Sequence, residues 1–200
     1  MEELLKTSFI AVLLVAGCAA RNTPPSADQP AAPPPILTGQ VVMVLPAQHG
    51  PAGGMSMEPV TGLDRELEFW LSEQTPRVQW VFASELERIL ARSPSLEIDL
   101  HSLAVSSFHR GEVRNIGDPL FGDLNKLGAL TNARAALIPV AAAWIPDGAG
   151  SGRVEISVAL IDNRTGRVIW TGVVAGQPGP AGSAGVAATA AEALAGLIAR

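Results

Sequence analysis

The feature that most constrains this fold is a pair of strand-like segments joined by a turn tetrapeptide. "RVEISVALID" (153–162) and "RVIWTGVVAG" (167–176) flank "NRTG" (163–166). In the first segment the apolar residues Val154, Ile156, Val158 and Leu160 occupy alternate positions. This period of two is typical of a strand with one buried face, and Gly166 supplies the left-handed conformation that closes a tight hairpin. The chain is therefore predicted to contain an antiparallel hairpin packed against a core.

Three more segments have strand character. "ILTGQVVMVLP" (36–46) is rich in β-branched residues and bounded by prolines, and "RVQWV" (77–81) reads as a short strand. "AALIPVAAAWI" (135–145) is apolar throughout, and its Pro139 is expected at a sheet edge or a β-bulge, because proline donates no ladder hydrogen bond.

Helical periodicity of three to four residues appears in four other places. The apolar stripes are Leu63, Leu67, Trp70 and Leu71; Leu86, Ile89 and Leu90; Leu120, Leu124 and Leu127; and Val186, Ala190, Leu194, Leu197 and Ile198. Ser84 and Glu87 have the spacing of a capping box at the start of the second helix. Asp118 and Pro119 are expected as N-cap and first helical residue of the third helix, which should end near Asn132.

The order of these elements predicts the fold class. Strand, helix, strand and helix are followed by helix, three strands and a helix, which indicates a single two- or three-layer α/β domain over residues 36–200 with a mixed sheet. The domain is expected to end in a β-hairpin followed by a helix. Residues 95–117 fit no regular pattern, although "HSLAVSSF" (101–108) has extended character.

The only cysteine, Cys18, follows directly after the apolar run "FIAVLLVAG". A charged start with Lys6, an apolar stretch and small residues before a cut are typical of a secretory signal. "VAGC" (15–18) resembles the lipobox of bacterial lipoproteins. An uncleaved membrane helix fits less well, because 9–20 gives only 12 residues where a span needs about 20, and nothing amphipathic marks a core cysteine.

The lipobox predicts a signal peptide over residues 1–17, cleavage between Gly17 and Cys18, and acylation of Cys18. Several acyl chains at one terminus anchor a protein firmly in a membrane. Ala19 in the next position resembles the pattern of lipoproteins sent to the outer membrane. We therefore expect a lipid-anchored protein of the outer membrane that faces the periplasm.

A Pro-rich linker follows the anchor. Residues 18–35 contain six prolines and no large apolar side chain, so they cannot form a core. Such a tether reaches on the order of 50 Å at about 3.1 Å per residue and would hold the domain away from the membrane.

The domain resembles a group of bacterial envelope proteins. The similarity rests on "DPLFGDLNKLGALTNARAALIPV" (118–140), which runs from helix into strand, and on "VEISVALIDNRTGRVIWTGVV" (154–174) before a closing helix. The group comprises the amino-terminal domain of the Tol translocation protein, the curli secretion lipoprotein and the lipoprotein activator of penicillin-binding proteins. The resemblance implies a non-catalytic envelope module that docks onto a partner protein, and it carries over no functional residue.

Composition and motifs narrow the function classes. The formal net charge of −5 argues against nucleic acid as a partner. The histidines His49, His101 and His109 stand in none of the common hydrolase or metalloprotease motifs. We therefore expect no enzyme activity, no cofactor and no metal centre.

The alternative function is a small-ligand or metal-binding periplasmic lipoprotein. "HGPAGGMSM" (49–57) places His49, Met55 and Met57 on one segment, and imidazole with thioether ligands suits cuprous copper. A Gly-rich loop with two methionines is more often only a loop, so the main expectation stays with an envelope protein as the partner. Its contacts are sought in 101–117, together with the loop 48–61, because loops on a rigid scaffold commonly bind. The candidate contact residues are Phe108, Arg110 and Arg114, with His109 beside them, all expected to be exposed.

The lipobox yields a first prediction. Cys18→Ser removes the thiol that accepts the lipid, so cells should contain uncleaved precursor or a soluble product without palmitate label. Metabolic labelling followed by precipitation of the protein checks this, with Ser26→Ala in the linker as the control. Normal labelling of the Cys18→Ser chain would show that the lipobox interpretation is wrong.

Overall fold

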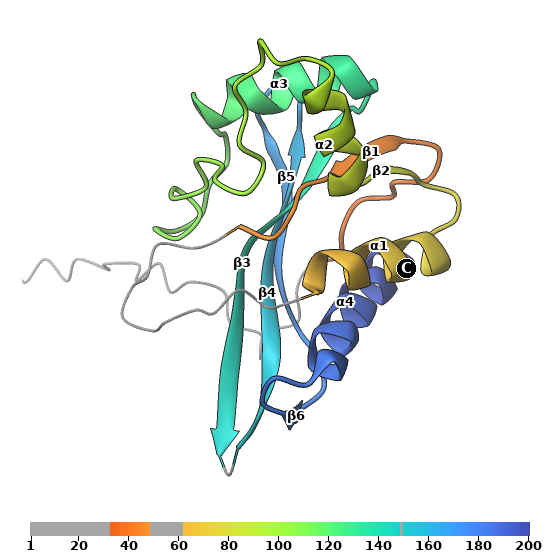
Figure 1. Ribbon diagram of the computed structural model, residues 1–200, viewed down its shortest axis with the longest axis vertical. Helices are drawn as coiled ribbons and strands as arrows, with labels where there is room; N and C mark the ends of the chain where they lie inside the picture. The colour runs from red at the N-terminus through yellow and green to blue at the C-terminus, as the bar shows by residue number, and fades with distance from the viewer. Residues whose placement is uncertain (1–32, 49–61, 149) are drawn as a thin grey trace, which may run out of the picture.

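Figure 1 shows the computed structural model of the chain, which describes residues 33–48, 62–148 and 150–200. The predicted signal peptide, Cys18 and the predicted linker up to residue 32 lie outside these residues, as do His49, Met55 and Met57. The strands are β1 (Val41–Val44), β2 (Gln79–Val81), β3 (Ala135–Gly148), β4 (Ser151–Asp162), β5 (Val168–Ala175) and β6 (Gly179–Pro180). The helices are α1 (Leu63–Gln74), α2 (Ala83–Ala91), α3 (Leu120–Thr131) and α4 (Ala184–Ile198).

The strands form one mixed sheet in the order β2-β1-β3-β4-β5, with β6 pairing the start of β4. β1 runs parallel to β2 and β3, whereas β4 runs antiparallel to β3 and β5. The predicted mixed α/β architecture is confirmed. β3 and β4 form a long ribbon that extends below the helices in Figure 1.

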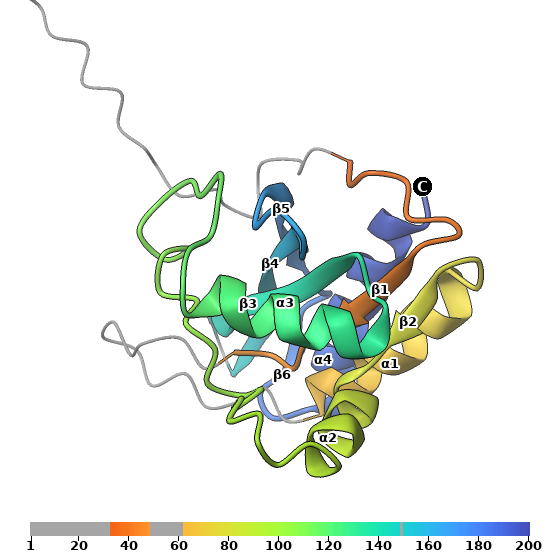
Figure 2. The ribbon, with the colours of Figure 1, turned by 90° about the horizontal axis from the view of Figure 1, so that it is seen from above.

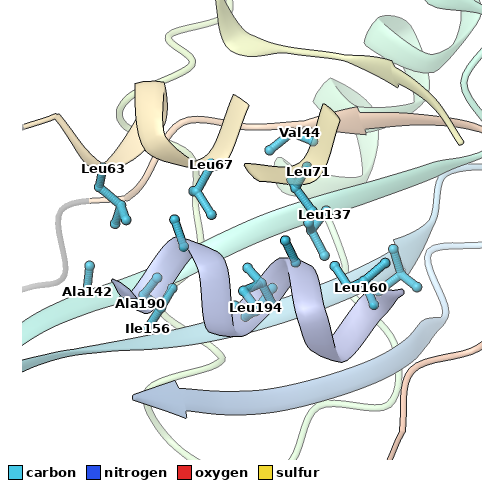
Figure 3. Close-up of a cluster of buried hydrophobic side chains, with 14 of the residues drawn as sticks. Val44, Leu63, Leu67, Leu71, Leu137, Ala142, Ile156, Leu160, Ala190 and Leu194 are labelled. Atoms are coloured by element: carbon cyan, nitrogen blue, oxygen red, sulfur yellow. The ribbon is translucent and has the colours of Figure 1, made fainter. Parts of the chain in front are cut away.

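Both faces of the sheet are covered, so the domain has three layers. α1 and α4 pack on one face, and α2, α3 and the segment between α2 and α3 pack on the other. Figure 3 shows Leu67 of α1, Leu194 of α4 and Leu160 of β4 in one cluster of buried side chains. Ala159 and Ile161 of β4 point to the opposite cluster. The alternation predicted from the sequence therefore places Leu160 and its even-numbered neighbours against α1 and α4.

The predicted hairpin turn and the predicted strand proline are both confirmed. Gly166 has φ of 69°, the left-handed conformation expected for it. Pro139 lies at a register shift between β3 and β4. Its carbonyl faces the other way and accepts from Gln48 N at 2.9 Å, past the end of β1. No strand of the described residues pairs there, which explains why β3 tolerates a residue without an N–H.

The helix starts differ from the predictions by one residue or more. α2 begins at Ala83 after Phe82, which makes no side-chain cap, so the capping box predicted from Ser84 and Glu87 is wrong. The ring of Phe82 stacks on Trp80 at 6.3 Å between centroids, and this contact fixes where the chain leaves β2. Glu87 instead lies 3.3 Å from His101.

α3 begins at Leu120, so Pro119 precedes the helix and does not form its first residue. Asp118 still accepts a hydrogen bond from Gly122 N at 3.1 Å, as a capping residue does. The predicted end near Asn132 is confirmed, because Asn132 has φ of 57°.

The extended conformation predicted for 101–108 is wrong. These residues form turns, because Leu103 and Val105 are buried against α3 while the main chain bonds locally. Gln48, 4% exposed, organises this segment. Its Nε2 donates to Leu100 O at 2.8 Å, and its Oε1 accepts from Leu103 N at 2.8 Å. The buried Gln48 side chain thus satisfies main-chain groups of this segment that a strand would have bonded to a neighbouring strand.

The burial of β4 yields a second prediction. Leu160→Asp puts an unpaired charge into the fully buried face against α4, which should cost about 3 kcal/mol or more of unfolding free energy. Ser157→Asp is the matched control, because this half-buried residue lies on the opposite face of the same strand. It should cost about 1 kcal/mol or less. Urea unfolding followed by circular dichroism measures both, and equal losses would refute the assignment of faces.

Candidate partner-binding site

The three predicted contact residues do not share one environment. Phe108 is half-buried and packs against the cluster under α3, so its expected exposure is wrong. The turn from Val105 to Phe108, closed by a 3.0 Å main-chain bond, directs the ring to the core. Arg110 is exposed, and the side chain of Arg114 is 85% exposed. Gly17 and Cys18 lie outside the described residues.

Arg114 lies at the outer edge of the sheet, beside the first residues of β5. Its carbonyl accepts from Val168 N at 2.9 Å, and Ile116 N donates to Gly166 O at 2.8 Å. Asn115 forms an antiparallel bridge with Arg167. A segment of three residues therefore already acts as a short additional strand on β5, and it ends before the middle of β5.

Beyond this point the outward main-chain groups of β5 pair with no strand of the described residues. Gly176 N donates to Val154 O at 2.9 Å, and the register pairs Val174 with Ile156. In an antiparallel strand the main-chain N–H and C=O groups of successive residues point alternately to the two neighbouring strands. Counting back from Gly176, the groups of Val174 and Gly172 bond to β4. Those of Thr171 and Val173 point outward, away from β4. Within residues 33–48, 62–148 and 150–200, no strand pairs with them.

A bulge sets this alternation. Val168 pairs with Ile161 and Trp170 with Leu160, so Ile169 has no opposite residue. The extra residue lets Val168 bond outward to Arg114 while Trp170, two positions later, faces β4.

A groove runs between the edge of β5 and the preceding loop. It is lined by Glu112, Val113, Arg114 and Asn115 on one side and by Arg167, Val168, Ile169, Trp170 and Thr171 on the other. Arg114 Nε is 3.7 Å from Glu112 Oε1, and both side chains are mostly exposed, so this ion pair contributes little. Two arginines against one glutamate make the groove basic on a chain whose net charge is −5.

The turn between β4 and β5 holds this groove in position. Asp162 Oδ1 accepts from Arg164 N at 2.9 Å and from Thr165 N at 3.0 Å. Burial raises the pKa of Asp162, but these hydrogen bonds and the Arg164 charge together outweigh it, so the pKa lies below its ordinary value. Gly166 fits closely, since a Cβ there would lie 3.0 Å from the Phe121 ring.

A second concave site lies at the carboxyl ends of the parallel strands β1 and β2. Its lining comes from β1, α1, α2 and the loop after α2: Val44, Leu45, Asp64, Arg65, Leu67, Glu68, Phe82, Ala83, Ser84, Glu87 and His101. Asp64 Oδ1 already accepts from Ala47 N at 2.8 Å. The crevice carries charges of both signs and could hold a small polar molecule, because α/β sheets bind ligands at such ends.

The described part of the chain contains no group of three or more histidine, cysteine or acidic side chains placed to hold a metal ion. Among the same residues, no helix has the length and apolar character needed to cross a membrane.

Sequence reasoning missed Arg167, Thr171 and Val173 as site residues. The hairpin pattern predicted their strand, but the pattern does not say that β5 is an edge. The polar side chains of Arg167 and Thr171 mark exposed positions of this strand, but they do not mark the strand as an edge.

No family model matches this chain, and no curated protein matches it. Solved structures that resemble it include the LpoB C-terminal domain from Salmonella enterica, with 15% identity over 71% of this chain and 85% of that chain and a TM-score of 0.43. Lipoprotein GNA1162 from Neisseria meningitidis has 16% identity over 72% of this chain and 84% of that chain, with a TM-score of 0.41. A chain of the PelC dodecamer from Paraburkholderia phytofirmans has 19% identity over 84% of this chain and 95% of that chain, with a TM-score of 0.40.

These TM-scores are too low to carry over a family or a function. The matched solved structures include one that is named as a lipoprotein. The finer resemblance to the Tol, curli secretion and activator proteins stays a prediction.

The turn yields a third prediction. Because the folded pKa of Asp162 is lowered, its stabilisation is fully present above the ordinary unfolded value of about 4 and is lost as pH falls through the folded pKa. Asp162→Ala should therefore lower the thermal midpoint at pH 7 and lower it much less near pH 2. Asp147→Ala, at the exposed end of β3, is the control for the loss of a carboxylate elsewhere in the chain. A deficit that is equal at both pH values would contradict the assigned role of the carboxylate.

Proposed function

We propose that this chain is a lipid-anchored, periplasm-facing accessory protein of the cell envelope, which binds another envelope protein without catalysing a reaction. The observation that carries this proposal is the basic groove beside the outward-facing main chain of β5. A sheet edge whose donors and acceptors point outward, next to exposed arginines, has the chemistry of a protein-docking site.

The amino-terminal sequence supports placement at a membrane. A lipobox ending at Cys18 supplies an acyl anchor, and the Pro-rich residues 18–35 supply a spacer. A tether of this kind keeps the domain near the membrane while it searches for a partner, which raises the effective concentration of the docking surface.

The surroundings of the histidines support binding over turnover. His101 and His109 are exposed, and in the described part of the chain the only side chain within hydrogen-bond distance of either ring is Glu87, 3.3 Å from His101. A catalytic base needs a nucleophile and an orienting group held beside it in a site that excludes water. The His101–Glu87 pair lies at the rim of the crevice at the ends of β1 and β2.

That crevice favours a second candidate function, the binding of a small polar molecule. It lies where the parallel strands end, and it combines Arg65, His101 and Ser84 with carboxylates. The copper-binding alternative rests on His49, Met55 and Met57, outside the described residues. Isothermal titration with Cu(I) tests it: a flat trace removes the copper alternative, and tight binding lost in Met55→Ala/Met57→Ala supports it.

A fourth prediction tests partner binding in cells. A photo-crosslinking amino acid placed at Asn115 should capture a specific envelope protein, whereas the same amino acid at Glu85, exposed on α2, should not capture it. Mass spectrometry identifies the captured protein. Arg114→Glu with Arg167→Glu should reduce its recovery while acylation and thermal midpoint stay unchanged, because both side chains are exposed.

Equal recovery from both positions would contradict docking at this groove. Turnover of an envelope substrate by the purified chain would overturn the proposed class of function.

A further inference from the structure

We infer that the outer edge of β5 binds an extended, acidic segment of the partner protein as an added β-strand. This inference rests on the proposed function and names the chemistry of the partner. The added strand would bond to the outward N–H and C=O groups of Thr171 and Val173, as in other cases of strand addition to a sheet edge.

β5 differs from the other edges of the described sheet. Proteins protect exposed edges with prolines, with very short strands or by covering them. β2 has only three residues. β3 carries Pro139 and Pro146 along the part that extends past β1. β5 has eight residues and no proline, and the segment 114–116 covers only its beginning.

The segment 114–116 also shows that this edge accepts a strand. Asn115 already pairs with Arg167 in antiparallel geometry, and Arg114 O accepts from Val168 N at 2.9 Å. The groove continues along Ile169, Trp170 and Thr171, in line with this short strand. An incoming strand can therefore continue the ladder along β5 without displacing the existing pair.

The positive charge of this groove favours an acidic ligand. Arg114 and Arg167 outnumber Glu112 there, and within the described residues no carboxylate forms an ion pair with Arg167. Glutamate or aspartate side chains on an added strand would pair with these arginines. A second copy of this chain fits less well, because the uncovered part of its own β5, residues 171–175, carries no acidic side chain.

The test uses a synthetic peptide as the probe. A fluorescent nine-residue peptide that alternates valine with glutamate is titrated against the full chain in mild detergent, and its anisotropy reports binding. We expect saturable binding that weakens with salt. A peptide that alternates valine with lysine should bind at least about tenfold more weakly, because like charges then meet at the groove.

Two further arms separate strand addition from plain charge attraction. The same acidic peptide with N-methyl groups on alternate amides keeps its charge and loses one hydrogen-bonding edge, so its affinity should fall at least about tenfold. Val173→Pro removes an outward donor while Gly172 and Val174 keep their bonds to β4, and it should also abolish binding. Val173→Ala retains the donor and should bind normally.

Hydrogen exchange gives a readout inside the protein. In the free chain the amides of Thr171 and Val173 should exchange faster than those of Gly172 and Val174, and the acidic peptide should slow the exchange of the first two. This arm holds even if Val173→Pro does not fold.

The inference is overturned if the acidic peptide does not bind, if the N-methylated peptide binds equally well, or if Thr171 and Val173 gain no protection. If one of these results is found while crosslinking from Asn115 persists, the proposed docking at this surface stands and the inference of strand addition is wrong. Loss of the crosslinks as well would remove both.

Discussion

The two-sided burial of β4 is the constraint on which the rest of the structure depends. β4 pairs with β3 on one side and β5 on the other, and its alternate side chains fill both clusters of the core. The parallel strands join the sheet only through β3, and α4 contacts the sheet mainly through β4 and β5. Since hydrophobic burial is the main favourable term in folding, the hairpin holds the layers together and fixes where its own outer edge lies.

The candidate docking edge is thus a product of the same hairpin. β5 is stabilised from within by β4 and by the turn at Asp162, so its inner bonds do not depend on a partner. Beyond Arg114, no strand of the described residues pairs with its outer groups. A strand that is hydrogen-bonded to the sheet along its inner side already has the conformation needed for binding along its outer side. Binding to it therefore costs less conformational entropy than binding to a flexible loop would.

The sequence predicted the elements whose side chains repeat regularly. The period of two in β4, the helical stripes of α1 and α4 and the left-handed Gly166 are all local signals, and the structure confirms them. It did not predict the path of 101–108, because Leu103 and Val105 are positioned by Gln48, more than fifty residues away. For the same reason it did not predict the site. Strand order is decided by pairing partners, so no pattern within 168–175 marks β5 as an edge.

The pairing around the unpaired Ile169 gives the edge its phase. If Ile169 were paired with a residue of β4 and the alternation continued regularly from Val168, the main-chain groups of each later residue of β5 would turn to the other side. Thr171 would then bond to β4, and Gly172 and Val174 would face outward. Deleting Ile169 would leave Thr171 and Val173 facing outward, because Val168 opposite Ile161 and Trp170 opposite Leu160 would then follow each other in a regular ladder. The pairing of Trp170 with Leu160, and not the length of the chain before it, decides which peptide groups this protein offers to its surroundings.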